Sequence, residues 1–135
     1  MYTPSAFADS MQDAIKTDLE VVVDGVSNSR GNVRIAVFSE ADTALFADHL
    51  PPLKQIVAAT GQPITFYFNN LTTGHYAALA FQDENSNGIL DRNFFGIPKE
   101  RWGVTGKRPF GRNPRYIESI FVLDREHQKT IIHLE

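Results

Sequence analysis

The chain has no cysteine, and this absence excludes disulfide bonds, thiolate catalysis and cysteine metal sites together. No stretch approaches 18 consecutive apolar residues, so no membrane-spanning helix is expected. Positive charge is not in excess either, since the formal net charge is −3, which argues against a nucleic-acid partner. The histidines form no HxH or HExxH pattern, so zinc is not expected; they are His49, His75, His127 and His133.

The pattern of apolar residues indicates an all-β protein. From residue 17 onward, short runs rich in Val, Ile, Phe and Tyr are separated by Gly, Asn, Pro and Asp. We predict about seven antiparallel strands in two packed sheets, a β-sandwich. The expected strands span 19–23, 32–38, 63–68, 75–81, 117–123 and 129–134, with an edge strand at 54–59 and helical turns at 41–50. The first two are expected to form a hairpin.

The first residues give a hint about location. The sequence Ala6-Phe7-Ala8 is similar to the small-x-small end of a secretory signal, although no apolar segment precedes it. A short helix capped near Asp9 or Ser10 is the other interpretation. We therefore expect a leader remnant or short helix over 1–16, one sandwich domain over 17–135, and an exported protein in the periplasm or outside the cell.

Residues 83–91 have the spacing of a calcium-binding loop. Short oxygen-bearing side chains occupy positions 1, 3, 5 and 9, a glycine at position 6 allows a sharp turn, and position 7 offers a backbone carbonyl. The predicted metal ligands are Asp83, Asn85, Asn87, Ile89 and Asp91. Only two of them are ionised, so we expect calcium as a weakly bound cofactor, with a Kd of about 10⁻⁴ to 10⁻³ M.

Two features set this loop apart from an EF-hand. Position 12 is Phe94 instead of a bidentate Glu, and the segment before the loop is predicted to be a strand instead of a helix. An ordinary turn that uses Asn, Asp, Ser and Gly for their left-handed backbone angles is the alternative.

A long connection over 92–115 follows, and such connections in compact domains are usually functional or disordered. It contains the only tryptophan and a local excess of basic residues. Arginine and tryptophan suit an anionic group attached to an apolar body. The predicted ligand-binding residues of this basic aromatic loop (94–115) are Lys99, Arg101, Trp102, Lys107, Arg108 and Arg112. The partner would be an anionic small molecule, a lipid headgroup or a glycan.

The segments 81–93 and 95–103 together resemble the DUF2141 family, small exported bacterial proteins of uncharacterised function. The resemblance implies a transthyretin-like or immunoglobulin-like β-sandwich and an envelope location, but no reaction. Two departures stand out. Gln82 replaces the family's histidine, and the segment after Gly106 is basic where the family is usually acidic.

Two classes of function follow from these observations. The first is an exported, non-enzymatic binding module in which calcium orders the 83–91 loop beside the basic aromatic loop. The alternative is an enzyme that uses Asp83, Asp91 or Glu118 as acid or base in a pocket under the long loop. The sequence contains no nucleophile elbow, phosphate-cradling glycine loop or dinucleotide fingerprint, which favours the first.

Overall fold

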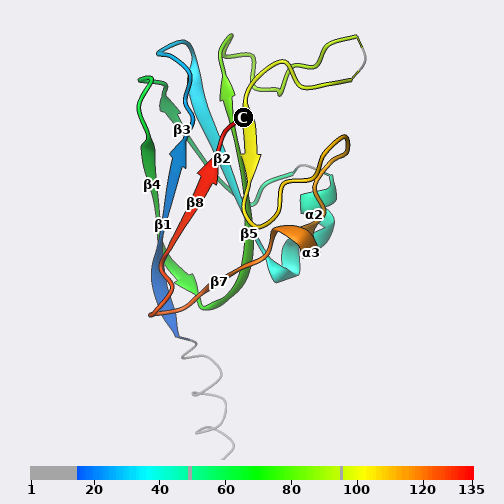
Figure 1. Cartoon of the computed structure of the whole chain (residues 1–135). Coiled ribbons are helices and arrows are strands. Elements are labelled where there is room, and N and C mark those ends of the chain that lie inside the picture. Colours follow the sequence, from blue (N-terminus) through cyan, green and yellow to red (C-terminus); the bar gives the residue numbers. More distant parts are fainter. Residues whose placement is uncertain (1–14, 49, 95) are drawn as a thin grey trace, which may run out of the picture.

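Two sheets form the scaffold of the computed structural model, which describes residues 15–48, 50–94 and 96–135 (Figure 1). The small sheet has the strand order β4-β1-β8, and the large sheet has the order β3-β2-β5-β6, with β7 also paired to β5. The strands in these residues are β1 (Lys16–Asp24), β2 (Asn32–Ser39), β3 (Leu53–Ala58), β4 (Ile64–Thr72), β5 (Gly74–Asp83), β6 (Trp102–Val104), β7 (Phe121–Leu123) and β8 (Lys129–His133). The predicted all-β sandwich is confirmed.

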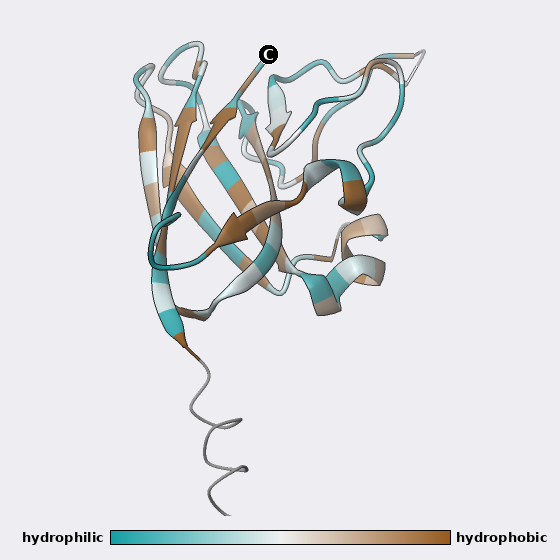
Figure 2. Cartoon of the chain, turned by 60° about the horizontal axis from the view of Figure 1, so that its bottom comes forward, coloured by the Kyte–Doolittle hydropathy of each residue, from teal (hydrophilic) through white to brown (hydrophobic). Residues whose placement is uncertain are grey.

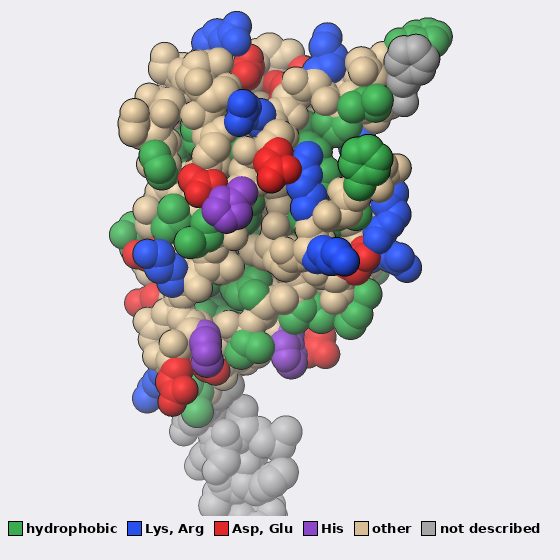
Figure 3. Space-filling view, in the orientation of Figure 1, with side chains coloured by type: hydrophobic (Ala, Val, Ile, Leu, Met, Phe, Trp, Pro, Cys, Tyr) green, Lys and Arg blue, Asp and Glu red, His purple; other side chains and the backbone are tan. Residues whose placement is uncertain are grey.

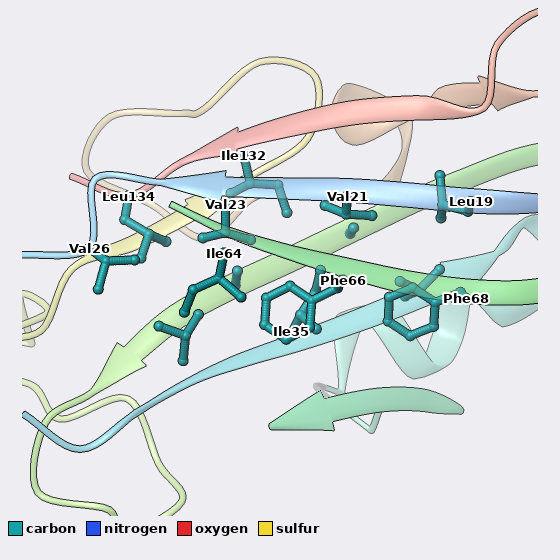
Figure 4. Packing of buried hydrophobic residues seen from close by; sticks show 14 of the residues in the cluster. Leu19, Val21, Val23, Val26, Ile35, Ile64, Phe66, Phe68, Ile132 and Leu134 are labelled. Atoms are coloured by element: carbon teal, nitrogen blue, oxygen red, sulfur yellow. The ribbon is translucent and has the colours of Figure 1, made fainter. Parts of the chain in front are cut away.

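The core lies between the sheets because one face of each strand is apolar. In β1, Leu19, Val21 and Val23 are buried while the residues between them are partly exposed. They pack with Phe66 of β4, in the same sheet, and with Ile35 of β2, in the facing sheet (Figure 4). Figure 2 shows the same alternation as brown and teal bands along the strands. Removing a side chain such as that of Phe66 would cost about 3–5 kcal/mol of folding free energy.

Short helices cover part of the outer face of the large sheet. They are the 3-10 turn η1 (Glu40–Asp42), α2 (Thr43–Ala47) and α3 (Tyr116–Ser119). The ring of Phe46 makes edge-to-face contacts with Phe38 at 5.1 Å and with Tyr116 at 5.7 Å between ring centroids. These three rings belong to a second hydrophobic cluster, and the burial of Phe46 in it explains why helical turns form within the predicted segment 41–50. No helix in the described residues has the length and apolar character needed to cross a bilayer.

Two predictions about strand pairing were wrong. The first two strands do not form a hairpin, because β1 and β2 belong to different sheets and the connection crosses between them through Gly25 at φ +78°. The sandwich is not purely antiparallel, because β1 pairs in parallel with β8. The last two strands, β7 and β8, also lie in different sheets.

Two further differences concern the second half of the chain. The segment 117–123 begins inside helix α3, where the Glu118 carboxylate accepts a hydrogen bond from the Arg115 backbone amide and the Ser119 hydroxyl donates to the Arg115 carbonyl. The long connection 92–115 contains strand β6. The predicted edge strand at 54–59 is confirmed as β3. Of the predicted leader or helix over 1–16, residues 1–14 lie outside the described residues, and β1 already begins at Lys16.

Candidate functional site

The 83–91 loop is folded around the carboxylate of Asp83. This side chain lies at the end of β5 and is fully buried. Its Oδ1 accepts a hydrogen bond from the Asn87 backbone amide at 3.2 Å, and its Oδ2 accepts one from the Gly88 amide at 2.8 Å. Gly88 has φ +84°, which glycine adopts at little steric cost. Asp83 therefore shapes the loop from within.

A basic residue from a neighbouring strand neutralises Asp83. The Nε of Arg34, on β2, donates to Asp83 Oδ2 at 2.8 Å, and the Arg34 side chain is 27% exposed while that of Asp83 is 0% exposed. The guanidinium also lies over Gly88, where an added Cβ would be 3.8 Å from Nη2. Asp83 Oδ2 thus has two donors, and Oδ1 keeps one lone pair open. Arg34 was not among the site residues predicted from the sequence.

Asp91 gathers the two asparagines of the loop. Its oxygens accept hydrogen bonds from Asn85 Nδ2 at 2.6 Å and from Asn87 Nδ2 at 2.8 Å. The hydrogen bond from Asn87, then that from Asn85, and the nearby positive charge of Lys99 lower the pKa of Asp91. The loop thus concentrates carboxylate and amide groups around one ionised side chain.

Glu100 closes the loop at its base. Its Oε2 accepts from the Glu84 backbone amide at 2.8 Å and its Oε1 from the Asp91 backbone amide at 2.9 Å, and the side chain is nearly buried. One carboxylate therefore holds both ends of the loop together. The sequence signal that could have identified Glu100 is its position as the only acid among the basic residues of 99–115.

A polar groove of about 290 Å³ opens between this loop and the segment that follows it. It joins two of the predicted metal ligands, Asn85 and Asp91, to one of the predicted anion ligands, Lys99. The remaining lining residues are Arg30, Glu84 and Glu100. The groove lies where the 84–101 connection leaves the end of the sandwich. Figure 1 shows this connection at its upper right.

The other predicted anion ligands do not gather at this groove. Arg108 stacks on the Trp102 ring, with the guanidinium carbon 4.1 Å from the ring centroid, and its Nη1 donates to the Trp102 carbonyl at 2.6 Å. Arg112 forms a bidentate ion pair with Glu118. Arg101 donates to the Gly25 carbonyl at 3.3 Å, and Lys107 is exposed. Figure 3 shows blue and red side chains next to each other at the right of this face instead of an unbroken basic patch.

Two of the carboxylates proposed for catalysis, Asp91 and Glu118, have pKa values shifted away from what a general acid needs. The hydrogen bond from Arg112, followed by the backbone amide of Arg115, lowers the pKa of Glu118 to about 2, and the pKa of Asp91 is also lowered. A general acid at neutral pH needs the opposite shift. Glu118 is also absent from the lining of the groove. In the ranges 15–48, 50–94 and 96–135, no group of three or more His, Cys, Asp or Glu side chains is arranged to hold a metal ion.

Gln82, directly before the 83–91 loop, has a structural role. It is fully buried, and its Nε2 donates to the Asn28 and Arg30 carbonyls at 3.2 and 3.1 Å. Its Oε1 accepts from the Ser27 backbone amide at 2.9 Å. The Gln82 amide therefore ties the 27–30 turn to β5, directly beside the 83–91 loop.

Comparisons with known proteins give one family and one distant structure. No curated protein matches the sequence. A solved structure described as a fimbrial assembly protein from Parabacteroides distasonis aligns with a TM-score of 0.47 and 9% identity, covering 90% of this chain and 53% of that one. The chain therefore spans about half the length of that protein. The family described as uncharacterized protein conserved in bacteria, DUF2141, matches residues 21–131. The chain belongs to the DUF2141 family.

Proposed function

We propose that this protein is an exported, non-enzymatic binding module whose groove binds an anionic group with the help of calcium. The observation that supports the proposal is the lining of the groove, which brings Asn85 and Asp91 beside Lys99. Oxygen ligands for a hard cation and a cation for an anionic ligand thus share one surface.

Calcium would be held by oxygens that the loop already concentrates. A half-turn of the Asn85 and Asn87 amides exchanges nitrogen for oxygen at nearly the same positions, and the two groups that now donate to Asp91 become ligands beside it. The open lone pair on Asp83 Oδ1 and the carbonyl of Ile89 complete the set. Because Arg34 already offsets the charge of Asp83, Asp91 is the one carboxylate among the proposed calcium ligands that has no ion pair within the described residues, and binding is weak.

The anionic group would be bound by Lys99, and Arg30 also lines the groove. Arg30 is paired with Glu84 at 3.0 Å, so Lys99 is the cation that a ligand reaches at least cost. Calcium at Asp91 would cancel the negative charge next to Lys99 and would raise the affinity for a carboxylate or phosphate. The two binding events are therefore coupled.

Thermal unfolding of the full chain tests the calcium site. With a Kd of about 10⁻⁴ to 10⁻³ M, 10 mM calcium stabilises the folded state by roughly 1.4–2.7 kcal/mol, and an equal concentration of magnesium does so less. Asp91→Asn should abolish the calcium-induced rise in Tm. Asp124→Asn is the matched control, because Asp124 also has its pKa lowered by neighbouring hydrogen bonds, first that of His127, but lies on another turn.

Binding to two probes tests the anion site and shows whether the anionic group belongs to a lipid headgroup or to an acidic glycan. We would measure binding to phosphatidylglycerol vesicles and to chondroitin sulfate, with and without calcium. Lys99→Gln should weaken calcium-dependent binding to one of the two about tenfold, and the responding probe identifies lipid headgroup or acidic glycan as the source. Lys129→Gln, on β8, is the control. If neither probe binds better with calcium, the proposal is refuted.

A further inference from the structure

The two sheets end differently on their two sides. On one side, β6 and the residues after β8 are joined by backbone hydrogen bonds, since Glu135 donates to the Trp102 carbonyl at 3.1 Å and Trp102 donates to the Glu135 carbonyl at 3.3 Å. On the other side, β3 ends the large sheet and β4 ends the small sheet. Both of these edge strands lie at the left of Figure 1. In the part of the chain that the structure describes, no further strand pairs with them.

A side-chain contact shows that these two edge strands lie next to each other on the same side of the sandwich. The Nε2 of Gln55, in β3, donates to the backbone carbonyl of Tyr67, in β4, at 2.6 Å. The Tyr67 carbonyl therefore points away from β1 and toward the open side. We refer to β3 and β4 together as the open edge.

Two apolar side chains flank Gln55 on the inner face of β3 and are only partly covered. Leu53 and Val57 pair with Val37 and Val33 of β2, and paired residues point to the same face of a sheet. The two β2 valines are fully buried, whereas Leu53 is 37% and Val57 40% exposed. The small sheet stops at β4 and leaves this part of the large sheet bare.

The open edge also lacks the charges that usually protect such edges. Single-domain proteins discourage edge pairing with lysines, prolines or bulges. Here Lys54 is the only charged residue between Leu53 and Thr72, and the prolines at 51, 52 and 63 lie outside both strands. Ile56 and Tyr67 are exposed on the outer faces. A charged partner would have only Lys54 with which to form an ion pair at this edge.

We propose that the open edge is a homodimer interface, in which β3 pairs antiparallel with β3 of a second copy about a two-fold axis. The pairing places Gln55 opposite Gln55, Lys54 opposite Ile56 and Leu53 opposite Val57 of the other copy, so that paired side chains lie on the same face. No like charges then face each other, and the exposed Leu53 and Val57 are covered. A two-fold contact needs one self-complementary patch, and an uncharged edge with a single off-centre lysine provides it.

The full chain in solution tests this proposal. Sedimentation equilibrium from about 1 to 200 μM should show a species of twice the 15.1 kDa chain mass. Ile56→Lys should weaken dimerisation at least about tenfold, since it adds charge beside Lys54 at the interface. Ile131→Lys is the matched control, because Ile131 is an isoleucine on β8 with 47% exposure, compared with 51% for Ile56. It should leave the dimer unchanged.

Charge reversal at one position tests the register. Ile56→Lys places like charges opposite Lys54, whereas Ile56→Glu places opposite charges there. The two pairs in each dimer should make the Ile56→Lys variant dimerise about tenfold more weakly than Ile56→Glu. Circular dichroism confirms that each variant is folded. A monomer at all concentrations, or equal effects of Ile56→Lys and Ile131→Lys, overturns the interface, and equal effects of Ile56→Lys and Ile56→Glu overturn the register.

Discussion

Replacing Arg34 with glutamine is expected to destabilise the folded protein by about 2 kcal/mol. The change removes the charge-assisted hydrogen bond to Asp83 and leaves a fully buried carboxylate with only its two backbone donors. Breaking a fully buried ion pair costs roughly 3–5 kcal/mol. Because Arg34 is 27% exposed, water can solvate the site in part, and the loss of one charge-assisted hydrogen bond, about 1.5–3 kcal/mol, is the better guide.

Urea unfolding followed by the fluorescence of Trp102, the only tryptophan, measures this change. The midpoint should fall with little change in the m value, and Tm should fall by roughly 6–10 °C for a chain of this length. Arg30→Gln provides the matched control. Its ion pair with Glu84 spans 3.0 Å, but Arg30 is 71% exposed, so its loss should cost less than about 1 kcal/mol.

A comparison of the two variants can refute the reasoning. Equal stability of Arg34→Gln and Arg30→Gln would show that Arg34 does not stabilise the buried carboxylate. Adding Asp83→Asn to Arg34→Gln should cost less than the sum of the two single changes, because the unpaired charge disappears with it.

Two further predictions concern pH and backbone geometry. Glu118 has a folded-state pKa of about 2 against an ordinary value of 4.5, so its stabilising effect is fully present above about pH 5 and is lost as the pH falls toward 2; Arg112→Gln should flatten this part of the acid-unfolding curve. Gly31→Ala should prevent stable folding at φ +67°, because its Cβ would lie 1.9 Å from the Asp83 carbonyl oxygen, whereas Gly96→Ala, at φ +78° with open space around it, should cost only about 1 kcal/mol by urea unfolding.

The fold class could be predicted because it depends on local pattern. The alternation of Leu19, Val21 and Val23 with polar residues is visible in the sequence and needs no knowledge of partners. Strand pairing could not be predicted in the same way. A valine-rich strand looks the same whether its neighbour is the next strand or one more than a hundred residues away, and whether that neighbour is parallel or antiparallel.

In the candidate site, too, local features could be predicted and contacts between distant residues could not. The spacing of Asp83, Asn87 and Gly88 is local, and the loop that it predicts is present, closed by hydrogen bonds among those residues. Calcium binding by this loop stays a prediction. Arg34 could not be identified, because it is 49 residues away and occupies an ordinary outward position on β2. The basic residues formed one group in sequence but separate in the structure, since Arg108 and Arg112 find different partners.

The parallel pairing of β1 with β8 has a consequence for how the chain folds. Asp24 and His133, which face each other in this pair, are 109 residues apart. At about 5–20 residues per second, synthesis leaves β1 without this neighbour for roughly 5–20 s. Contacts of such long range also make folding slow, in the millisecond-to-second range. The small sheet is therefore completed only after β8 has been made, and until then the central strand of that sheet is open to association with other nascent chains.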